Sequence, residues 1–126
     1  MKQYIDDSKP IYLQIAEKIE DDILNISLAE GDSVPSTNQF AQHFQINPAT
    51  AAKGINKLVE EGILFKKRGI GMFVQKRARQ VIMQKRSESF YNEYIIPLLR
   101  EAKKLNLDQK TIIALIEKAE SEENHG

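Results

Sequence analysis

The chain has 126 residues, no cysteine, and equal numbers of acidic and basic side chains, 18 of each. This length suits one compact domain or a small domain with an appendage, and the lack of cysteine excludes disulfides, zinc–thiolate sites and cysteine nucleophiles. The N-terminus lacks the apolar segment of a secretory signal and no run reaches the roughly 20 apolar residues of a membrane span, so we expect a soluble, cytoplasmic protein without membrane contact.

The charges are segregated along the chain. Residues 1–35 carry a net charge of −5, residues 36–86 a net charge of +8, and residues 87–126 a net charge of −3. A polyanion responds to the local field and not to the net charge of the whole molecule. The basic block therefore favours a nucleic-acid partner, although charge runs are also common on ordinary solvated faces.

The first segment has apolar residues at helical spacing. They follow Pro10, which is favoured in a first helical turn, and the opposite face is charged. Gly31 and Pro35 break the periodicity, so residues 28–35 are predicted to be a turn-rich connection. The apolar residues that define the helix are Ile11, Ile15, Ile19 and Ile23.

Two further helices with a tight turn between them follow the connection. Ser36 and Gln39 have the spacing of a capping box at the start of a short helix. Asn47 is a favourable cap for the next helix, and Pro48 occupies its first position. Gly54 lies inside this second helix although glycine costs about 1 kcal/mol there relative to alanine. We interpret Gly54 as the site of a close crossing with another helix.

A basic hairpin follows the second of these helices. Two short apolar strands, 63–65 and 72–74, flank the turn 66–71, in which Gly69 and Gly71 permit positive φ angles. A helix, a turn, a helix and a cationic hairpin in this order are typical of a winged helix-turn-helix. That fold places one helix in the major groove of DNA and the hairpin beside the backbone.

The residue types of the second helix and the hairpin fit DNA contacts. Hydroxyl and ammonium groups suit phosphates or base edges, and glycines allow the backbone to approach closely. The residues predicted to contact DNA on these grounds are Asn47, Ala49, Thr50, Lys53, Lys57, Lys67, Arg68, Gly69 and Gly71. The sequence contains no catalytic constellation, no nucleotide loop and no metal-ligand spacing, so neither an enzyme nor a cofactor nor a metal site is expected.

A second module is predicted from residue 77 onward. Pro97 lies within a long apolar-periodic segment, which it should kink or divide, and Asp108 can cap a final helix. Two such helices cannot bury their apolar stripes alone, so we expect them to pair with a second copy of the chain. The predicted dimer contacts are Phe90, Tyr91, Tyr94, Leu98, Ile112 and Ile116. The aromatic residues among them could instead line a pocket for an unknown small-molecule effector.

Five separate motifs, in matching order over roughly residues 9–75, resemble the GntR family of bacterial transcription regulators. The opening Asn-Pro of the second helix and the C-terminal part of only about 50 residues look most like the YtrA-type subfamily. The motifs are Pro10-Ile11-Tyr12-x-Gln14-Ile15, Gly31-Asp32-x-Val34-Pro35-Ser36, Ile46-Asn47-Pro48-Ala49-Thr50, Leu58-x-x-Glu61-Gly62-Ile63-Leu64 and Arg68-Gly69-x-Gly71-x-Phe73-Val74.

This resemblance implies a winged helix-turn-helix in residues 1–76 and a two-helix dimerisation extension in residues 77–126, a mostly α fold with a small β-wing. By family position it implies DNA contacts from Ser36, Asn38, Ala49, Thr50, Lys53 and Gly71. The sequence departs from the family at Asn38, where arginine is usual, and at Pro48 and Ala49, where many members have arginine and threonine.

The predicted function is therefore a sequence-specific regulator of transcription, in particular a repressor, that binds a palindromic site in double-stranded DNA as a homodimer. Two alternatives stay open at this point. The winged helix could serve as a protein-interaction module, or the C-terminal helices could form a small-ligand sensor.

Overall fold

The computed structural model describes residues 8–125. Residues 1–7, which the predicted first domain includes, and Gly126 lie outside the described residues. The chain divides into two compact units, residues 1–85 and residues 86–126. Among the described residues, the first unit contains three helices, the start of a fourth and a three-stranded sheet, and the second unit is helical.

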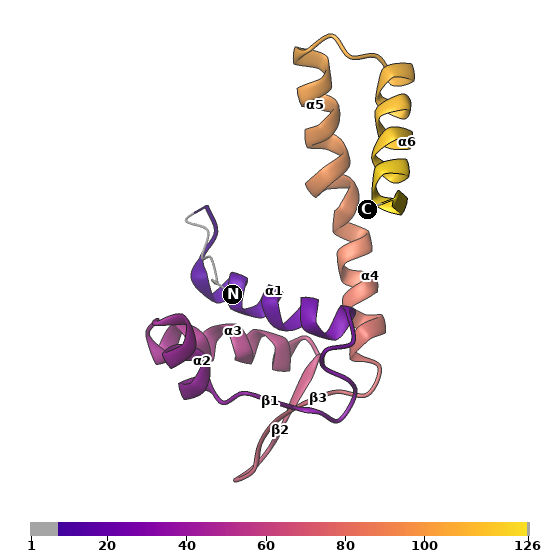
Figure 1. The fold of residues 1–126 in the computed structure, drawn as a ribbon. Coiled ribbons are helices and arrows are strands. Elements are labelled where there is room, and N and C mark those ends of the chain that lie inside the picture. Colours follow the sequence, from indigo (N-terminus) through magenta and orange to yellow (C-terminus); the bar gives the residue numbers. More distant parts are fainter. Residues whose placement is uncertain (1–7, 126) are drawn as a thin grey trace. The chain divides into compact units, whose positions relative to one another are not determined.

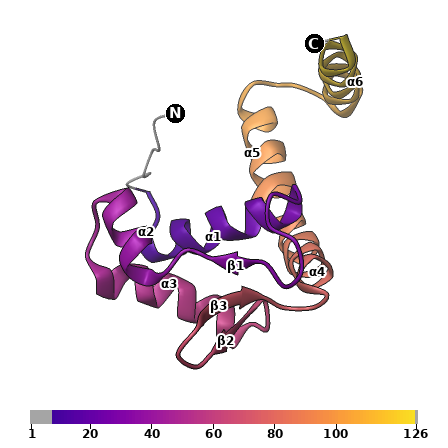
Figure 2. The same ribbon diagram turned by 60° about the horizontal axis from the view of Figure 1, so that its bottom comes forward.

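Three helices form the body of the first unit: α1 (Ile11–Leu24), α2 (Thr37–Phe44) and α3 (Pro48–Glu60). α3 packs against both α1 and α2, and Figures 1 and 2 show α1 lying alongside it. Fully buried side chains from α1 and α3 form the centre of the core, where each contributes about 1.5–3 kcal/mol to stability. They include Ile15, Ile19, Ile55 and Leu58.

The predicted close crossing at Gly54 is confirmed. A Cβ atom built on Gly54 would lie 2.6 Å from the carbonyl oxygen of Tyr12 and 3.2 Å from the Cβ of Ile15. Both neighbours belong to α1. Glycine therefore lets the two backbones approach more closely than any side chain would allow, and this contact fixes the position of α3.

The predicted helix caps are also confirmed. The Ser36 hydroxyl accepts a hydrogen bond of 3.1 Å from the Gln39 N–H, and the Gln39 side-chain oxygen accepts one of 2.7 Å from the Ser36 N–H. The Asn47 side-chain oxygen accepts a bond of 2.7 Å from the Ala49 N–H. Between the helices Gln45 adopts a left-handed conformation with φ of 56°. Local side-chain chemistry therefore sets where α3 begins.

The sheet corrects two details of the sequence prediction. It has the order β1-β3-β2, with β1 (Ser33–Val34), β2 (Leu64–Lys67) and β3 (Gly71–Val74) all antiparallel. β1 lies within the segment predicted to be a turn, because a strand of two residues has no periodicity to detect. The hairpin strands also extend further than predicted, so the turn is reduced to residues 68–70.

The second unit continues α4 (Ala78–Phe90), which begins in the first unit, where Ala78 and Ile82 are fully buried. The π-helical segment η1 (Tyr91–Ile95), α5 (Ile96–Lys104) and α6 (Gln109–His125) follow. The long helix is divided just before Pro97, as predicted, because proline has no N–H to donate and the hydrogen-bond pattern changes to π there.

The cap of α6 is the predicted one. The Asp108 carboxylate accepts a hydrogen bond of 2.9 Å from the Thr111 N–H. Hydrogen bonds from the Thr111 side chain and backbone hold the pKa of Asp108 below its ordinary value.

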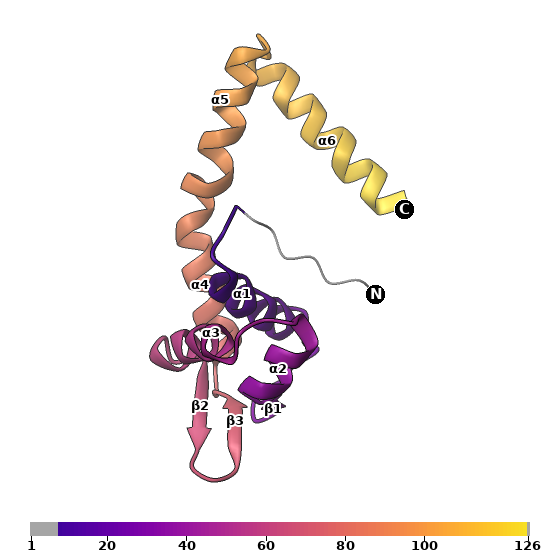
Figure 3. The same ribbon diagram turned by 90° about the vertical axis from the view of Figure 1, so that its left-hand side faces the viewer.

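The second unit has almost no core of its own. Among residues 86–125, Ala102 is the one buried residue. Figure 3 shows α6 diverging from α5 beyond their connection, where the Leu107 N–H donates to the Ala102 carbonyl at 2.9 Å. The apolar side chains of both helices are consequently left accessible to solvent.

Candidate nucleic-acid interface

The predicted DNA contacts lie on three elements of the first unit: the start of α2, the exposed part of α3 and the β2–β3 hairpin. Thr50 and Lys57 are half-buried, and the other predicted contacts are exposed. The exposed ones are Ser36, Asn38, Asn47, Ala49, Lys53, Lys67, Arg68, Gly69 and Gly71. Each of these contacts with DNA stays a prediction.

The first turn of α3 presents small side chains. Asn47, Pro48 and Ala49 are exposed, and the Asn47 side-chain oxygen is occupied by its bond to the Ala49 N–H. A helix N-terminus carries a partial positive charge that favours phosphate. With no long side chain in the way, the backbone at this end can come close to a polyanion.

Lys53 is held over an aromatic ring of α1. Its Nζ lies 4.1 Å from the centroid of the Tyr12 ring. A cation–π contact of this kind at an exposed site contributes about 0.5–1 kcal/mol. The contact orients the ammonium group without neutralising its charge, so Lys53 remains able to meet a phosphate.

Lys57 takes part in a chain of ion pairs that ends in the core. Its Nζ lies 2.5 Å from Glu61 Oε2. The other carboxylate oxygen, Glu61 Oε1, accepts a hydrogen bond of 2.8 Å from the Lys85 Nζ. Lys85, on α4, also donates to Glu20, whose side chain on α1 is only 3% exposed. These ion pairs therefore connect three helices: α1, α4 and the C-terminal end of α3.

The pKa values of this network follow from its geometry. Partial burial alone would raise the pKa of Glu61, but hydrogen bonds from Lys57 and Lys85, with the charges of both ammonium groups, outweigh it and lower the pKa. Burial alone would lower the pKa of Lys85, but hydrogen bonds to Glu20 and Glu61, with their charges, raise it. Each group is thus held in its charged form.

We expect Lys85→Met to lower the free energy of unfolding by about 2 kcal/mol. Breaking a buried ion pair costs about 3–5 kcal/mol, and solvent screening reduces this figure here because the Lys85 side chain is 36% exposed. Urea denaturation followed by circular dichroism measures the change. The double variant Glu20→Leu with Lys85→Met should recover most of the loss, since it also removes the buried charge.

Lys18→Met is the matched control for this variant. Lys18 forms a surface pair with Asp22 at 2.9 Å, and such pairs contribute only about 0.2–0.5 kcal/mol. Equal effects of the Lys18 and Lys85 variants would contradict a stabilising role for the network. Because the pKa of Glu61 is lowered and that of Lys85 is raised, the Lys85 contribution should be constant from about pH 4.5 to pH 10.5. It should be lost as the pH falls through the Glu61 pKa or rises through the Lys85 pKa.

The hairpin is braced by an aromatic pair across its strands. Phe65 and Phe73 are register partners with ring centroids 5.8 Å apart. The Lys67 Nζ lies 4.7 Å from the Phe73 centroid, which holds this charge along the strands. Figures 1 and 3 show the hairpin projecting from the helices, with its turn at the far end. Arg68 is exposed at that end.

Three features of the site were not found by sequence reasoning. The stacking of Lys53 on Tyr12 depends on the α1–α3 crossing and leaves no local signal. The Lys57–Glu61 pair could have been found from its i, i+4 spacing. Ile70, which was placed in the hairpin turn but not among the predicted contacts, is 74% exposed there.

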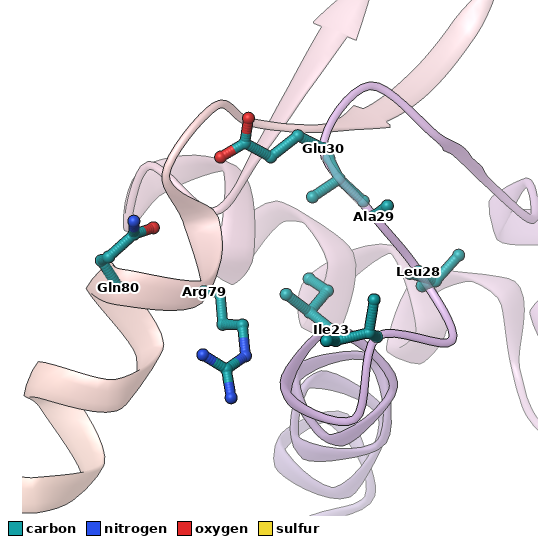
Figure 4. A pocket seen from close by; sticks show the side chains of 8 residues that line it. Ile23, Leu28, Ala29, Glu30, Arg79 and Gln80 are labelled. Carbon is teal, nitrogen blue, oxygen red and sulfur yellow. The ribbon is translucent and has the colours of Figure 1, made fainter.

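A pocket of about 270 Å³ lies where α4 begins, away from the predicted contacts (Figure 4). Its wall is mostly apolar, and its polar side chains join neighbouring segments. Arg79 Nε donates to the Leu24 carbonyl at 3.1 Å, and Glu30 accepts from the Arg77 N–H at 2.7 Å. The first bond connects the start of α4 to the end of α1, and the second connects it to the segment before β1.

Within residues 8–125, no three His, Asp or Glu side chains gather in a way that could hold a metal ion. Across the same residues, every helix is too short or too polar to span a membrane.

Comparison with curated proteins identifies regulators of transcription. The HTH-type transcriptional regulator YhcF of Bacillus subtilis is 28% identical over 113 residues, which are 90% of this chain and 92% of YhcF. The HTH-type transcriptional repressor YtrA of Bacillus subtilis is 31% identical over 77 residues. That match spans 61% of this chain and only 59% of YtrA.

Solved structures agree with this relationship. A GntR-family regulator from Bacteroides thetaiotaomicron is 31% identical, with a TM-score of 0.72 over 90% of this chain and 98% of that one. The DNA-binding domain of AraR in complex with operator ORX1 is 28% identical, with a TM-score of 0.51 over 59% of this chain and 90% of that one.

A family model described as "Bacterial regulatory proteins, gntR family" matches residues 11–74, about half of the chain. The match covers α1 through β3 and so contains the complete helix-turn-helix and its hairpin. The winged fold and the similarity to YtrA were both expected from the sequence, and both are confirmed. The chain therefore belongs to the gntR family of bacterial regulatory proteins and is a DNA-binding transcription regulator, not an enzyme.

Proposed function

We propose that this protein represses transcription as a homodimer in the bacterial cytoplasm, and that it binds a palindromic operator through α3 and the β2–β3 hairpin. The observation that carries the proposal is the presence of exposed cations on both of these elements. Residues 36–86 have a net charge of +8 within a neutral chain. Two of the cations in this block, Lys53 and Arg68, are exposed on α3 and at the hairpin turn.

The relatives support repression and the binding of an operator. YtrA is a repressor, and the AraR domain that matches this winged helix was solved on an operator. A repressor needs only to occupy its site and block access to the promoter.

The exposed apolar residues of the second unit support the proposed homodimer. Phe90, Tyr91 and Tyr94 are 52–61% exposed, Leu98 is 42% exposed and Ile116 is 48% exposed. An exposed apolar surface of this kind is typical of an interface, and a two-fold dimer makes the two surfaces self-complementary. Two-fold symmetry in the protein then requires a palindromic operator, with half-sites about 34 Å apart.

The proposed docking predicts a reduced salt dependence when cations are removed. Lys53→Ala and Arg68→Ala should each weaken operator binding and lower the slope of log K against log salt by about 0.9 for each phosphate that is no longer neutralised. The operator is first selected with the wild-type protein from a random-sequence duplex pool. Fluorescence anisotropy at several salt concentrations then gives the slopes.

Lys110→Ala is the matched control because Lys110 is exposed on α6, in the second unit. Its slope should equal that of the wild type. If all three variants kept the wild-type slope, the docking surface would lie elsewhere. If no duplex were selected from the pool, the function itself would be wrong, and a role in protein interaction would take its place.

A further inference from the structure

The pocket beside the first turn of α4 has the size of a small metabolite (Figure 4). Its volume of about 270 Å³ equals that of about nine water molecules, at about 30 Å³ each. Pockets for drug-sized ligands are larger, roughly 300–1,000 Å³, so a molecule the size of an amino acid suits this one. All lining residues belong to the first unit. The aliphatic part of the wall is formed by Ile23, Ile26, Leu28, Ala29 and Val74.

Two opposite charges, on Glu30 and Arg79, line the same pocket without neutralising each other. Glu30 Oε1 accepts a hydrogen bond of 2.7 Å from the Arg77 N–H. Arg79 donates from Nε to the Leu24 carbonyl at 3.1 Å and from Nη1 to the Met83 sulfur at 3.3 Å. Within the part of the chain that the structure describes, nothing engages the Arg79 Nη2 group or the second Glu30 oxygen. Both charges therefore keep hydrogen-bonding capacity for a ligand.

Ile26 joins the wall in a backbone conformation that is unfavourable for isoleucine. Its φ is 65°, just after the C-cap of α1, where glycine or asparagine is usual. A β-branched residue rarely adopts this left-handed region, and the Ile26 side chain is also 67% exposed. Strain of this kind is common at ligand-binding sites. Neither the turn nor the core calls for isoleucine here, whereas a ligand with an apolar group would cover it.

We propose that this pocket binds a free aliphatic α-amino acid such as leucine. The ligand carboxylate accepts hydrogen bonds from the Arg79 guanidinium, and the ligand ammonium donates to the Glu30 carboxylate. Such charge-assisted bonds fix the orientation of the ligand, and the aliphatic side chain gains affinity by covering the apolar wall. An aliphatic acid or an aliphatic amine satisfies only one of the two charges, so the pair of charges selects a zwitterion.

The proposal is tested by titrating the full chain with L-leucine in the absence of DNA. Calorimetry gives the dissociation constant, and amide NMR spectra locate the site. The shifts should concentrate in residues 23–30 and 74–80, which contain the lining residues. Leucine should bind at least about tenfold more tightly than isocaproate, which lacks the ammonium group, or isoamylamine, which lacks the carboxylate. Glycine, which has no side chain to cover the wall, should also bind more weakly.

Two variants test the roles of the charged side chains. Glu30→Gln and Arg79→Gln should each weaken leucine binding on the order of tenfold. The amide oxygen in the first variant can still accept from the Arg77 N–H, so the segment keeps this bond. Glu60→Gln and Lys76→Gln are the matched controls, because each removes one charge from an exposed position outside the pocket. Both should keep the wild-type affinity for leucine.

Three results would overturn the inference. Amide spectra unchanged by millimolar leucine would show that the pocket does not bind this class of ligand. Equal affinity for leucine and isocaproate would show that Glu30 takes no part in binding. Wild-type affinity in both pocket variants would place the leucine site elsewhere. The ligand comparison uses the wild-type protein, so it stands even if a variant fails to fold, and without DNA in the experiment each result leaves the proposed function intact.

Discussion

Gly54→Ala should lower the free energy of unfolding by about 1–2 kcal/mol, although alanine is the better helix former. Alanine gains about 1 kcal/mol of helix propensity over glycine. The new methyl group, however, would lie 2.6 Å from the Tyr12 carbonyl oxygen and 3.2 Å from the Ile15 Cβ. The first neighbour is backbone and cannot rotate away, so α1 and α3 must separate. Overpacking of this kind costs about 1–3 kcal/mol and occasionally more.

A larger side chain at position 54 should destabilise the protein further. Gly54→Val should be less stable than Gly54→Ala by at least about 1 kcal/mol, because its branches extend further into the same contact. Asn56→Ala is the control, since Asn56 is exposed on the same helix and alanine there should be neutral or slightly stabilising. Urea denaturation followed by far-ultraviolet circular dichroism measures the free energy of unfolding of all three variants. A Gly54→Ala variant as stable as the wild type would show that the crossing can relax.

The displaced helix should also bind DNA less well. α3 carries Lys53, whose ammonium is oriented by the Tyr12 ring on α1. A shift between α1 and α3 would therefore move the cation from its place even where the domain remains folded. At a temperature where both proteins are folded, operator affinity of Gly54→Ala should still be below that of the wild type.

The parts of this structure that were predictable depend on neighbours close in sequence. The Ser36–Gln39 capping box and the Asn47 cap involve atoms two or three residues apart, so the residue types alone are enough to identify them. Gly54 was interpretable for a different reason. Glycine in a helix interior lowers stability, so its presence there indicates a compensating contact. A close crossing with another helix is the common contact of this kind.

The parts that were not predictable depend on residues distant in sequence. β1 exists only because β3 pairs with it, as in the Val34–Met72 register. The Lys85–Glu20 pair joins residues 65 positions apart, and neither of the two stands out in its own segment. At the candidate interface, the same limit explains why the lysines of α3 were identified while Tyr12, which contacts Lys53, and Lys85, which shares Glu61 with Lys57, were missed.

Leu98→Asp should convert the proposed dimer into a monomer and weaken binding to the full palindrome by about 10²–10⁴-fold. Leu98 is 42% exposed in a unit where Ala102 is the one buried residue between 86 and 125. A carboxylate at the centre of an apolar interface would have to lose its hydration without gaining a partner. A monomer then binds each half-site separately and loses the effective concentration that a linked second site provides.

A single half-site distinguishes this mechanism from damage to the DNA-binding unit. On a duplex that carries one half-site, Leu98→Asp and the wild type should bind with similar affinity, because the residues that meet the DNA are unchanged. Asn92→Asp adds the same charge at another exposed position of this helical segment and should remain dimeric. Light scattering gives the mass, which should be 14.4 kDa for the Leu98 variant and twice that for the control.

Two results would contradict this prediction. A Leu98→Asp protein that keeps twice the monomer mass would exclude α5 as the dimer contact. The alternative contact would then be the apolar face of α6, where Ile113 and Ile116 are exposed. A monomeric variant that still binds the full palindrome as tightly as the wild type would separate dimerisation from operator recognition. In that case the second unit would contribute little to affinity, and the winged helix alone would account for DNA binding.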